Sequence, residues 1–258
     1  LQAFNHYLQI RDSIIAELQG CRIVAEMVKD FYEHNNALFF WNASKIGFPL
    51  RTDPEMILEL DPDWKVFDDY LASLSSKYRV RANAVRKSAA SLYESTLTLQ
   101  EMEKAKTEME RLFGAVRDKA PIQVLKPEID YLISLKKVLG DQVIVTGFYK
   151  DGKMLAFRTA ILGDNQLEAH FIGIDYEFNR EFDLYQNILY GLISDAISSK
   201  VSRVMYGRTA LEIKSTVGAK PYKLSCYIRF HNKLLNSVVK TFASGLGPKD
   251  WTPRSPFK

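Results

Sequence analysis

Hydrophobic positions recur at helical spacing in the first part of the chain and alternate with polar positions after residue 141. Over Phe4 to Leu18 the apolar side chains gather on one face, which predicts an amphipathic helix that ends at Gly20. Three shorter segments follow, namely a stretch of mixed strand and helix character, a helix and a strand: Arg22 to Phe31, Asn35 to Ile46 and Thr52 to Leu60.

The next part of the chain is predicted to be mainly helical. A long helical stretch runs from Asp63, the candidate N-cap, to about Ser91. A short strand over Leu92 to Leu99, a charged amphipathic helix over Gln100 to Lys119 and another helix over Lys126 to Leu139 follow. The buried side of the charged helix is expected to carry Met102, Ala105, Met109, Leu112 and Phe113.

Three successive strands are then predicted, because the hydrophobic period changes from near 3.6 to near 2. They cover Gln142 to Tyr149, Lys153 to Leu162 and Gln166 to Ile174. Asp151-Gly152 and Gly163-Asp164-Asn165 between them are hairpin turn signals. The sequence therefore predicts a three-stranded antiparallel meander.

Helices and strands alternate after the meander. The predicted order is helix, strand, short helix and strand, over Asp183 to Lys200, Val201 to Tyr206, Thr209 to Thr216 and Tyr222 to Phe230. A helix between two neighbouring strands is a crossover that makes them parallel, so the sheet is expected to be mixed. Ligands bind at the carboxyl ends of such strands, which places a site near 174–183 and 206–214.

Composition narrows the class of protein. The chain has 258 residues, is 47% hydrophobic and 26% charged, and carries a net charge of +4, as an ordinary globular protein does. Cys21 and Cys226 are far apart and form no CxxC or Cys/His spacing, so neither a disulfide framework nor a zinc or other metal site has support. The expected location is the cytoplasm, and no apolar run reaches the roughly 18–20 residues that span a bilayer.

Two segments of the second half resemble a known superfamily. Tyr206-Gly-Arg-Thr-Ala-Leu-Glu-Ile-Lys-Ser215 is similar to a motif of the GNAT-like branch related to Fem-type peptidyltransferases, and Phe171-Ile-Gly-Ile-Asp175 precedes a Tyr-bearing helix as in such proteins. The order of elements from Tyr93 to Phe230 also resembles a GNAT acyltransferase domain. The resemblance implies an α+β, or mixed α/β, GNAT-like acyl-CoA N-acyltransferase fold with a mixed central sheet flanked by helices.

The resemblance extends upstream in a weaker form. Trp64-Lys-Val-Phe-Asp-Asp-Tyr-Leu71 resembles a connector between two GNAT-like halves, and the segment after it carries five cations and no acid: Lys77, Arg79, Arg81, Arg86 and Lys87. The expected domains are a partial N-terminal GNAT-like half (1–62), a helical basic connector (63–91), the acyltransferase domain (92–243) and a loose C-terminal tail (244–258).

The sequence departs from the GNAT pattern where acetyl-CoA-using members hold a pyrophosphate. Their glycine-rich loop offers backbone N–H groups at a helix N-terminus. Here Asp175-Tyr-Glu-Phe-Asn-Arg-Glu-Phe-Asp183 has no glycine and four acids, with Arg180 as the one cation that could compensate. An aminoacyl donor, as in the Fem-type relatives, therefore competes with acyl-CoA.

Candidate catalytic residues lie at the end of the third meander strand. Transfer of an acyl group to an amine needs a base for the incoming amine and a donor for the developing oxyanion. His170 is the candidate base because its ordinary pKa is near neutrality, and Asp175 is a second candidate. Glu168, His170 and Ile172 are expected to share one face of the strand, and a structural role for His170 stays open.

The Tyr206 segment supplies the other candidates. Tyr206 could donate a proton, Arg208 could bind a phosphate or carboxylate, and Thr209 could cap the short helix whose first N–H groups face the sheet edge. Glu212 and Lys214 complete the constellation, with a local Arg208–Glu212 ion pair as the structural alternative. Tyr185 could line an acyl channel, although it and Tyr190 are also typical of a core.

The sequence thus favours an N-acyltransferase that moves an acyl group from acyl-CoA, acetyl-CoA or longer, to a small-molecule or peptide amine without a metal. One alternative is Fem-like aminoacyl transfer from charged tRNA, which the missing glycine loop and the basic run favour. The other is a catalytically silent GNAT-like binding module.

Overall fold

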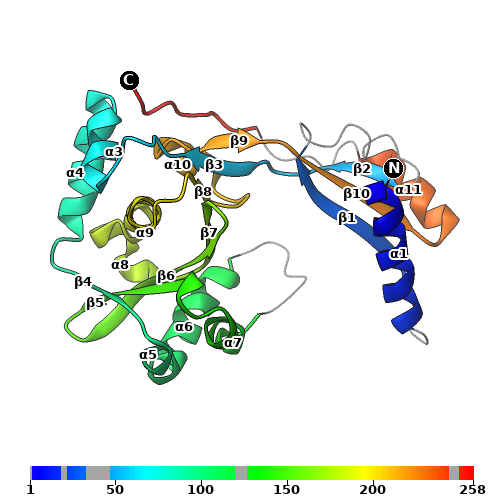
Figure 1. Cartoon of the computed structure of the whole chain (residues 1–258), viewed down its shortest axis with the longest axis horizontal. Helices are drawn as coiled ribbons and strands as arrows, with labels where there is room; N and C mark the ends of the chain where they lie inside the picture. Colours follow the sequence, from blue (N-terminus) through cyan, green and yellow to red (C-terminus); the bar gives the residue numbers. More distant parts are fainter. Residues whose placement is uncertain (1, 19–21, 33–46, 120–126, 244–249) are drawn as a thin grey trace. The chain divides into compact units, whose positions relative to one another are not determined.

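The computed structural model describes residues 2–18, 22–32, 47–119, 127–243 and 250–258 (Figure 1). The chain forms two compact units, Leu1–Glu55 with Pro221–Trp251 and Met56–Lys220 with Thr252–Lys258. The domain ranges expected from the sequence stay predictions. The compact units divide the chain at other points, because the strand at residues 55–59 and the last seven residues pack with the second unit.

In its described residues, the first unit is a small antiparallel sheet with two helices. Its strands are β1 (Ala25–Tyr32), β10 (Leu224–Phe230) and β2 (Phe48–Arg51), with β10 in the centre. The helices are α1 (Gln2–Glu17) and α11 (Lys233–Ala243). The predicted helix over 4–18 and strand over 222–230 are confirmed in α1 and β10, and the mixed stretch 22–31 is a strand. Cys226 is buried in β10, while Cys21 and the predicted helix 35–46 lie outside the described residues.

A seven-stranded mixed sheet organises the second unit, in the order β4-β5-β6-β7-β8-β3-β9. The bounds are β3 (Glu55–Glu59), β4 (Tyr93–Thr96), β5 (Val143–Lys150), β6 (Lys153–Gly163), β7 (Gln166–Ile174), β8 (Arg203–Met205) and β9 (Lys220–Tyr222). Neighbours from β4 to β7 are antiparallel, and β7 and β8 are parallel. The predicted meander and the mixed sheet are therefore confirmed.

Helices cover both faces of this sheet (Figure 1). On one face lie α5 (Leu99–Lys104), α6 (Lys106–Arg117) and α7 (Ile129–Leu139), and η2 (Gly140–Gln142) leads into β5. Met102, Met109, Leu112 and Phe113 are buried there as predicted, while Ala105 is half-buried. Gly173 lets α6 approach β7, since a Cβ there would lie 2.7 Å from the Leu112 Cβ.

The opposite face is covered by α9 (Leu184–Ser198), which α8 (Tyr176–Phe182) precedes. Arg158 of β6 is buried against α9, where its Nε and Nη2 donate to the two Asp195 carboxylate oxygens at 2.9 and 3.1 Å. Its Nη1 donates to Glu94 of β4 at 2.9 Å. Gly191 makes room for this guanidinium, since a Cβ there would lie 2.5 Å from the Arg158 Cζ.

The predicted long helix over 63–91 is two helices, α3 (Phe67–Ser73) and α4 (Ser76–Ser88). The chain extends at Leu74 because this residue bridges to Phe257 and its side chain is buried. The N-cap of α3 is Val66 rather than Asp63. The Asp69 carboxylate accepts the backbone N–H groups of Val66 and Lys65, and these bonds lower its pKa.

Residues 252–258 are docked, which corrects the predicted loose tail for this part of it. The Pro256 carbonyl accepts the Ser75 N–H at 2.8 Å. The Phe257 ring packs against Trp64 and Tyr70, with ring centroids 5.9 and 6.2 Å apart. An ion pair between the Arg254 guanidinium and the Glu212 carboxylate also holds the segment. Aromatic contacts and backbone hydrogen bonds together hold this segment along α3 and α4.

Candidate functional site

Two parallel strands separate at the centre of the seven-stranded sheet. β7 and β8 pair only at Leu167–Val204 and Glu168–Met205. Beyond this point β8 stays with β3, where the Tyr206 N–H donates to the Met56 carbonyl at 2.8 Å. The carboxyl ends of β7 and β8 therefore diverge, at the position where the sequence predicted a site.

A β-bulge shapes the β7 side of this opening. Ala169 pairs with Ala160 and Ile172 with Arg158, so two residues of β7, His170 and Phe171, lie opposite Thr159. The Thr159 hydroxyl holds the bulge, because it donates to the Phe171 carbonyl and accepts the Phe171 N–H, both at 2.7 Å. The extra residue reverses the alternation. The predicted common face of Glu168, His170 and Ile172 is therefore interrupted, because Ile172 lies on the same face as Ala169 rather than Glu168.

A mainly apolar cavity of about 320 Å³ lies at the diverging strand ends. Its walls come from α6, β7, α8, α9 and the segment after β8. The lining residues are Phe113, Val116, Ala169, His170, Phe171, Ile172, Tyr176, Tyr185, Ile188, Leu189, Leu192, Tyr206, Thr209, Ala210 and Lys214. Five of the nine sequence-predicted site residues meet here: His170, Tyr185, Tyr206, Thr209 and Lys214.

His170 presents a neutral imidazole to the cavity wall. Burial lowers its pKa below the ordinary 6.5, so the ring is uncharged at neutral pH. The ring packs on Phe171 with centroids 4.2 Å apart and on Tyr131 at 5.6 Å. Among the described residues, no group hydrogen-bonds its buried Nε2 atom. A buried nitrogen in this state costs about 1–3 kcal/mol, which a hydrogen bond from a bound molecule would recover.

Tyr206 and Tyr185 supply the aromatic part of the wall. The Tyr206 hydroxyl is buried and donates to the Leu189 carbonyl of α9 at 2.9 Å. Burial raises the Tyr206 pKa well above its ordinary value and raises that of Tyr185 to about 12. Both phenols are therefore protonated at neutral pH, and the Tyr206 proton is engaged with α9.

Lys214 lines the other side of the cavity, on the short helix α10 (Leu211–Thr216). Its side chain is only 4% exposed, so a cationic residue is withdrawn from water beside apolar walls. The N-cap of α10 is Ala210 in the left-handed conformation (φ 53°), which corrects the prediction that Thr209 caps this helix. Gly207, with φ 77°, makes the sharp turn that follows β8.

The remaining four predicted residues do not line the cavity: Asp175, Arg180, Arg208 and Glu212. Arg180 is exposed on α8, and Arg208 is half-exposed after β8. Glu212 forms an ion pair with Arg254, which is 42 residues away. Sequence spacing could not indicate a partner from the end of the chain.

Asp175 caps α8, in the segment where the GNAT pattern has its glycine-rich loop. Its Oδ1 accepts the Glu177 N–H at 3.3 Å, and its Oδ2 lies 3.1 Å from Arg111 and 3.2 Å from Lys153. Burial raises the Asp175 pKa, but the hydrogen bonds from Lys153 and Arg111 outweigh it and lower the pKa below 3.8. The Asp175 carboxylate thus takes the place at the N-terminus of α8 that a bound anion would otherwise occupy.

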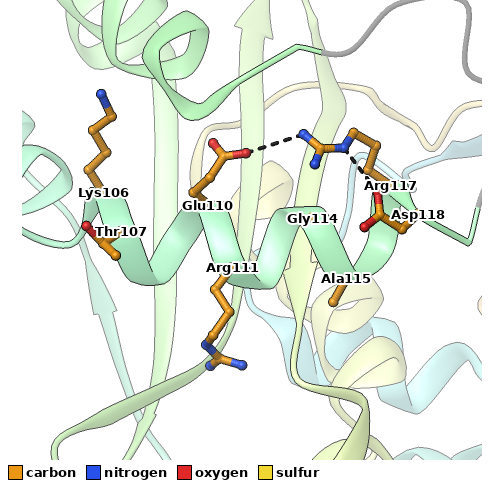
Figure 2. Close-up of a pocket in the computed structure, with 8 residues that line it drawn as sticks. All are labelled: Lys106, Thr107, Glu110, Arg111, Gly114, Ala115, Arg117 and Asp118. Carbon is orange, nitrogen blue, oxygen red and sulfur yellow. Dashed lines mark hydrogen bonds and ion pairs between the residues drawn. The ribbon is translucent and has the colours of Figure 1, made fainter.

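A second hollow, of about 600 Å³, follows the exposed side of α6 (Figure 2). Figure 2 shows Glu110 directed toward Arg117, at 3.3 Å, while Arg111 points to the other side of the helix. The second Glu110 oxygen accepts the Ile129 N–H at the start of α7. These charges join α6 to α7, so we assign them to the fold.

The described part of the chain offers neither a metal-binding cluster nor a membrane-spanning helix. In the described ranges, no cluster of three or more His, Cys, Asp or Glu side chains could hold a metal ion. No described helix is long and apolar enough to cross a bilayer.

The fold matches several solved structures. FemX has 12% sequence identity and a TM-score of 0.61, over 93% of this chain and 79% of FemX. The C-terminal domain of a candidate lysylphosphatidylglycerol synthetase from Agrobacterium fabrum has 10% identity and a TM-score of 0.54, over 85% and 72%. A GCN5-related N-acetyltransferase from Kribbella flavida has 14% identity and a TM-score of 0.51, over 88% and 75%.

No protein-family model matches the chain, and comparison with curated proteins finds no match. At identities of 10–14% the likeness concerns the fold. The chain therefore has the GNAT-like fold that the sequence resemblance predicted.

Proposed function

We propose that the protein transfers an acyl group from an activated donor to an amine, with the acyl chain in the cavity between β7 and β8. The observation that carries the proposal is this cavity at the diverging strand ends, with His170 and Lys214 among apolar walls. An apolar pocket with a few convergent polar groups suits a ligand that has a hydrocarbon part and one reactive carbonyl.

In the proposed reaction the amine nitrogen attacks the acyl carbonyl carbon. A C–N bond forms, the C–S or C–O bond to the donor breaks, and the leaving sulfur or oxygen takes up a proton. The neutral imidazole of His170 accepts the proton that the amine loses. The Lys214 side chain stabilises the negative charge that develops on the carbonyl oxygen.

The donor is proposed to be an acyl-CoA, acetyl-CoA or longer. The start of α8 does not fit its pyrophosphate, because the Asp175 carboxylate already accepts the Glu177 N–H and pairs with Arg111 and Lys153. The CoA phosphates would therefore bind other cations of the chain, for which Arg180 and Arg208 are the sequence candidates.

Aminoacyl-tRNA is a second candidate donor, and two observations favour it. One is the occupied start of α8. The other is α4, which carries no acid and exposes Lys77, Arg81 and Lys87. An RNA backbone would gain affinity there through counterion release. The reaction at the cavity is the same for both donors, because each presents an activated acyl carbon.

A thermal-shift titration tests the proposal and separates the donors. The wild-type chain is titrated with acetyl-CoA, longer acyl-CoAs, CoA and an aminoacyl-tRNA, because a ligand of the native state raises the unfolding temperature in proportion to RT ln(1 + [L]/Kd). In Ile172→Trp, a cavity-lining residue gains bulk, and in Lys214→Met the cation is removed. Ile14→Trp on α1, where Ile14 is 52% exposed, is the matched control.

We expect a dose-dependent shift with an acyl donor that Ile172→Trp abolishes and Ile14→Trp leaves intact. A shift with longer acyl-CoAs assigns the CoA donor, and a shift with aminoacyl-tRNA alone assigns the second donor. If no donor shifts the wild-type chain, or if Ile172→Trp shifts as the wild type does, the acyltransferase proposal is wrong and a binding module remains.

A further inference from the structure

The helix α11 exposes its apolar side chains. Leu234 is 76% exposed, Val238 47% and Leu235 39%, although exposed surface is where a helix normally places polar residues. At about 100° per residue these three positions occupy one side of the helix. The described residues of its own compact unit therefore leave much of the apolar side of α11 uncovered.

A polar residue holds α11 to the sheet. The Asn236 carboxamide oxygen accepts the Phe230 N–H of β10 at 2.9 Å, and Asn236 is half-buried. Asn236 lies about 160° around the helix from Leu234. The start of the helix is fixed as well, since the Asn232 side chain accepts the Leu235 N–H at 3.0 Å. Hydrogen bonds thus hold α11 in an orientation that turns Leu234 away from the sheet.

The segment of the sequence that contains α11 carries charges of a single sign. Within the compact unit of α11, residues 221–249 contain no acid and five cations: Lys223, Arg229, Lys233, Lys240 and Lys249. Lys233 and Lys240 belong to α11 itself, seven residues apart on one side of the helix, and both are exposed. An anionic surface is therefore the complementary partner.

We infer that α11 binds the surface of an anionic lipid bilayer, with Leu234, Leu235 and Val238 in the interfacial region and the lysines near the lipid phosphates. A helix with a strong apolar side, a lysine-bearing polar side and low net hydrophobicity is the type that lies in a membrane interface. The inference does not depend on acyl transfer.

Two other occupants fit less well. A second copy of the chain would place the acid-free segments of both copies face to face, where Lys233 and Lys240 would repel their counterparts. A nucleic acid would satisfy the lysines but leave the exposed leucines in water. A bilayer surface satisfies both features at once.

Sedimentation of the full chain with lipid vesicles tests the inference. The vesicles are phosphatidylcholine alone or phosphatidylcholine mixed with phosphatidylglycerol, at low and high salt. We expect binding to the anionic vesicles that weakens with salt and falls strongly on phosphatidylcholine alone, because a lysine near an anionic surface contributes about fivefold in affinity.

Two pairs of substitutions separate the apolar and the charged contributions. The double variant Leu234→Ser, Val238→Ser changes exposed positions, so the protein should still fold. Its affinity for the anionic vesicles should fall at least tenfold. Lys233→Gln with Lys240→Gln should bind more weakly and lose most of its salt dependence. Val138→Ser on α7, where Val138 is 81% exposed, is the matched control and should bind as the wild type does.

Circular dichroism establishes that each variant is folded. The inference is overturned if the wild-type chain does not bind anionic vesicles, or if the serine pair binds them as tightly as the wild type. It is also overturned if sedimentation velocity without vesicles shows a dimer that the serine pair abolishes, since a second copy would then be the partner.

Discussion

Replacing Arg158 by methionine is expected to lower the free energy of unfolding by about 3–5 kcal/mol, because it leaves the mostly buried Asp195 carboxylate without a counter-charge. The Arg158 side chain is 6% exposed and that of Asp195 18%. Two charge-assisted hydrogen bonds at 2.9 and 3.1 Å join them, and each contributes about 1.5–3 kcal/mol. The third bond, to Glu94, adds less because that carboxylate is 48% exposed.

Urea unfolding followed by near-UV circular dichroism and tryptophan fluorescence, to which Trp64 contributes, measures this change. The corresponding fall in the thermal midpoint is about 6–20 °C. Arg86→Met is the control, because Arg86 is 50% exposed and its ion pair with Asp68 spans 3.4 Å, so its loss should cost less than about 1 kcal/mol.

A double variant separates the charge from the packing. Arg158→Met with Asp195→Leu removes the unpaired carboxylate, so it should recover at least half of the stability that Arg158→Met loses. Strictly additive losses in the double variant, or a loss below about 1 kcal/mol in Arg158→Met, would refute the assignment of Arg158 as the buried ionic link between β6 and α9.

Three further predictions concern the cavity wall and the end of the chain. Phe257→Ala should lower the free energy of unfolding by roughly 2 kcal/mol, about half the cost at a fully buried site, because Phe257 is half-buried against Trp64 and Tyr70. Thermal unfolding measures this loss, with Pro253→Ala at an exposed position of the same segment as the control. Tyr206→Phe should cost about 0.5–1.5 kcal/mol because it removes the hydrogen bond to the Leu189 carbonyl, whereas Tyr93→Phe at a 68% exposed site should cost almost nothing in the same urea assay. His170 should make the free energy of unfolding depend on pH, because burial lowers its folded-state pKa: its contribution to stability is complete above the unfolded pKa of 6.5 and is lost as the pH falls toward the folded pKa. Urea unfolding at a series of pH values should therefore show that His170→Gln loses less stability at acid pH than the wild type does. The same loss in both proteins would contradict a buried neutral imidazole.

The elements with strong periodicity were predictable from the sequence. The meander β5 to β7 followed from alternating residues and turn signals, and the buried side of α6 followed from helical spacing at Met109, Leu112 and Phe113. In each case the local pattern and the tertiary burial agree, since one face of the element packs on the sheet.

Parts of the candidate site depend on contacts between distant segments, and these were not predictable. The bulge that brings His170 and Phe171 to one cavity is a single extra residue, held by Thr159 across the sheet. Arg111 and Lys153 reach Asp175 from other elements. Short-range spacing suggested a partner for Glu212 within one helical turn, but the actual partner is Arg254.

The docking of residues 252–258 also bears on how the protein is made. The unit that starts at Met56 includes these residues, while the 31 residues before them, Pro221–Trp251, belong to the other unit. During synthesis on the ribosome, the aromatic surface of Trp64 and Tyr70 stays uncovered until the chain has been synthesised as far as Phe257. A nascent chain stalled before residue 252 would therefore expose this surface to chaperones, and folding of the larger unit would finish only after residues 252–258 have been synthesised.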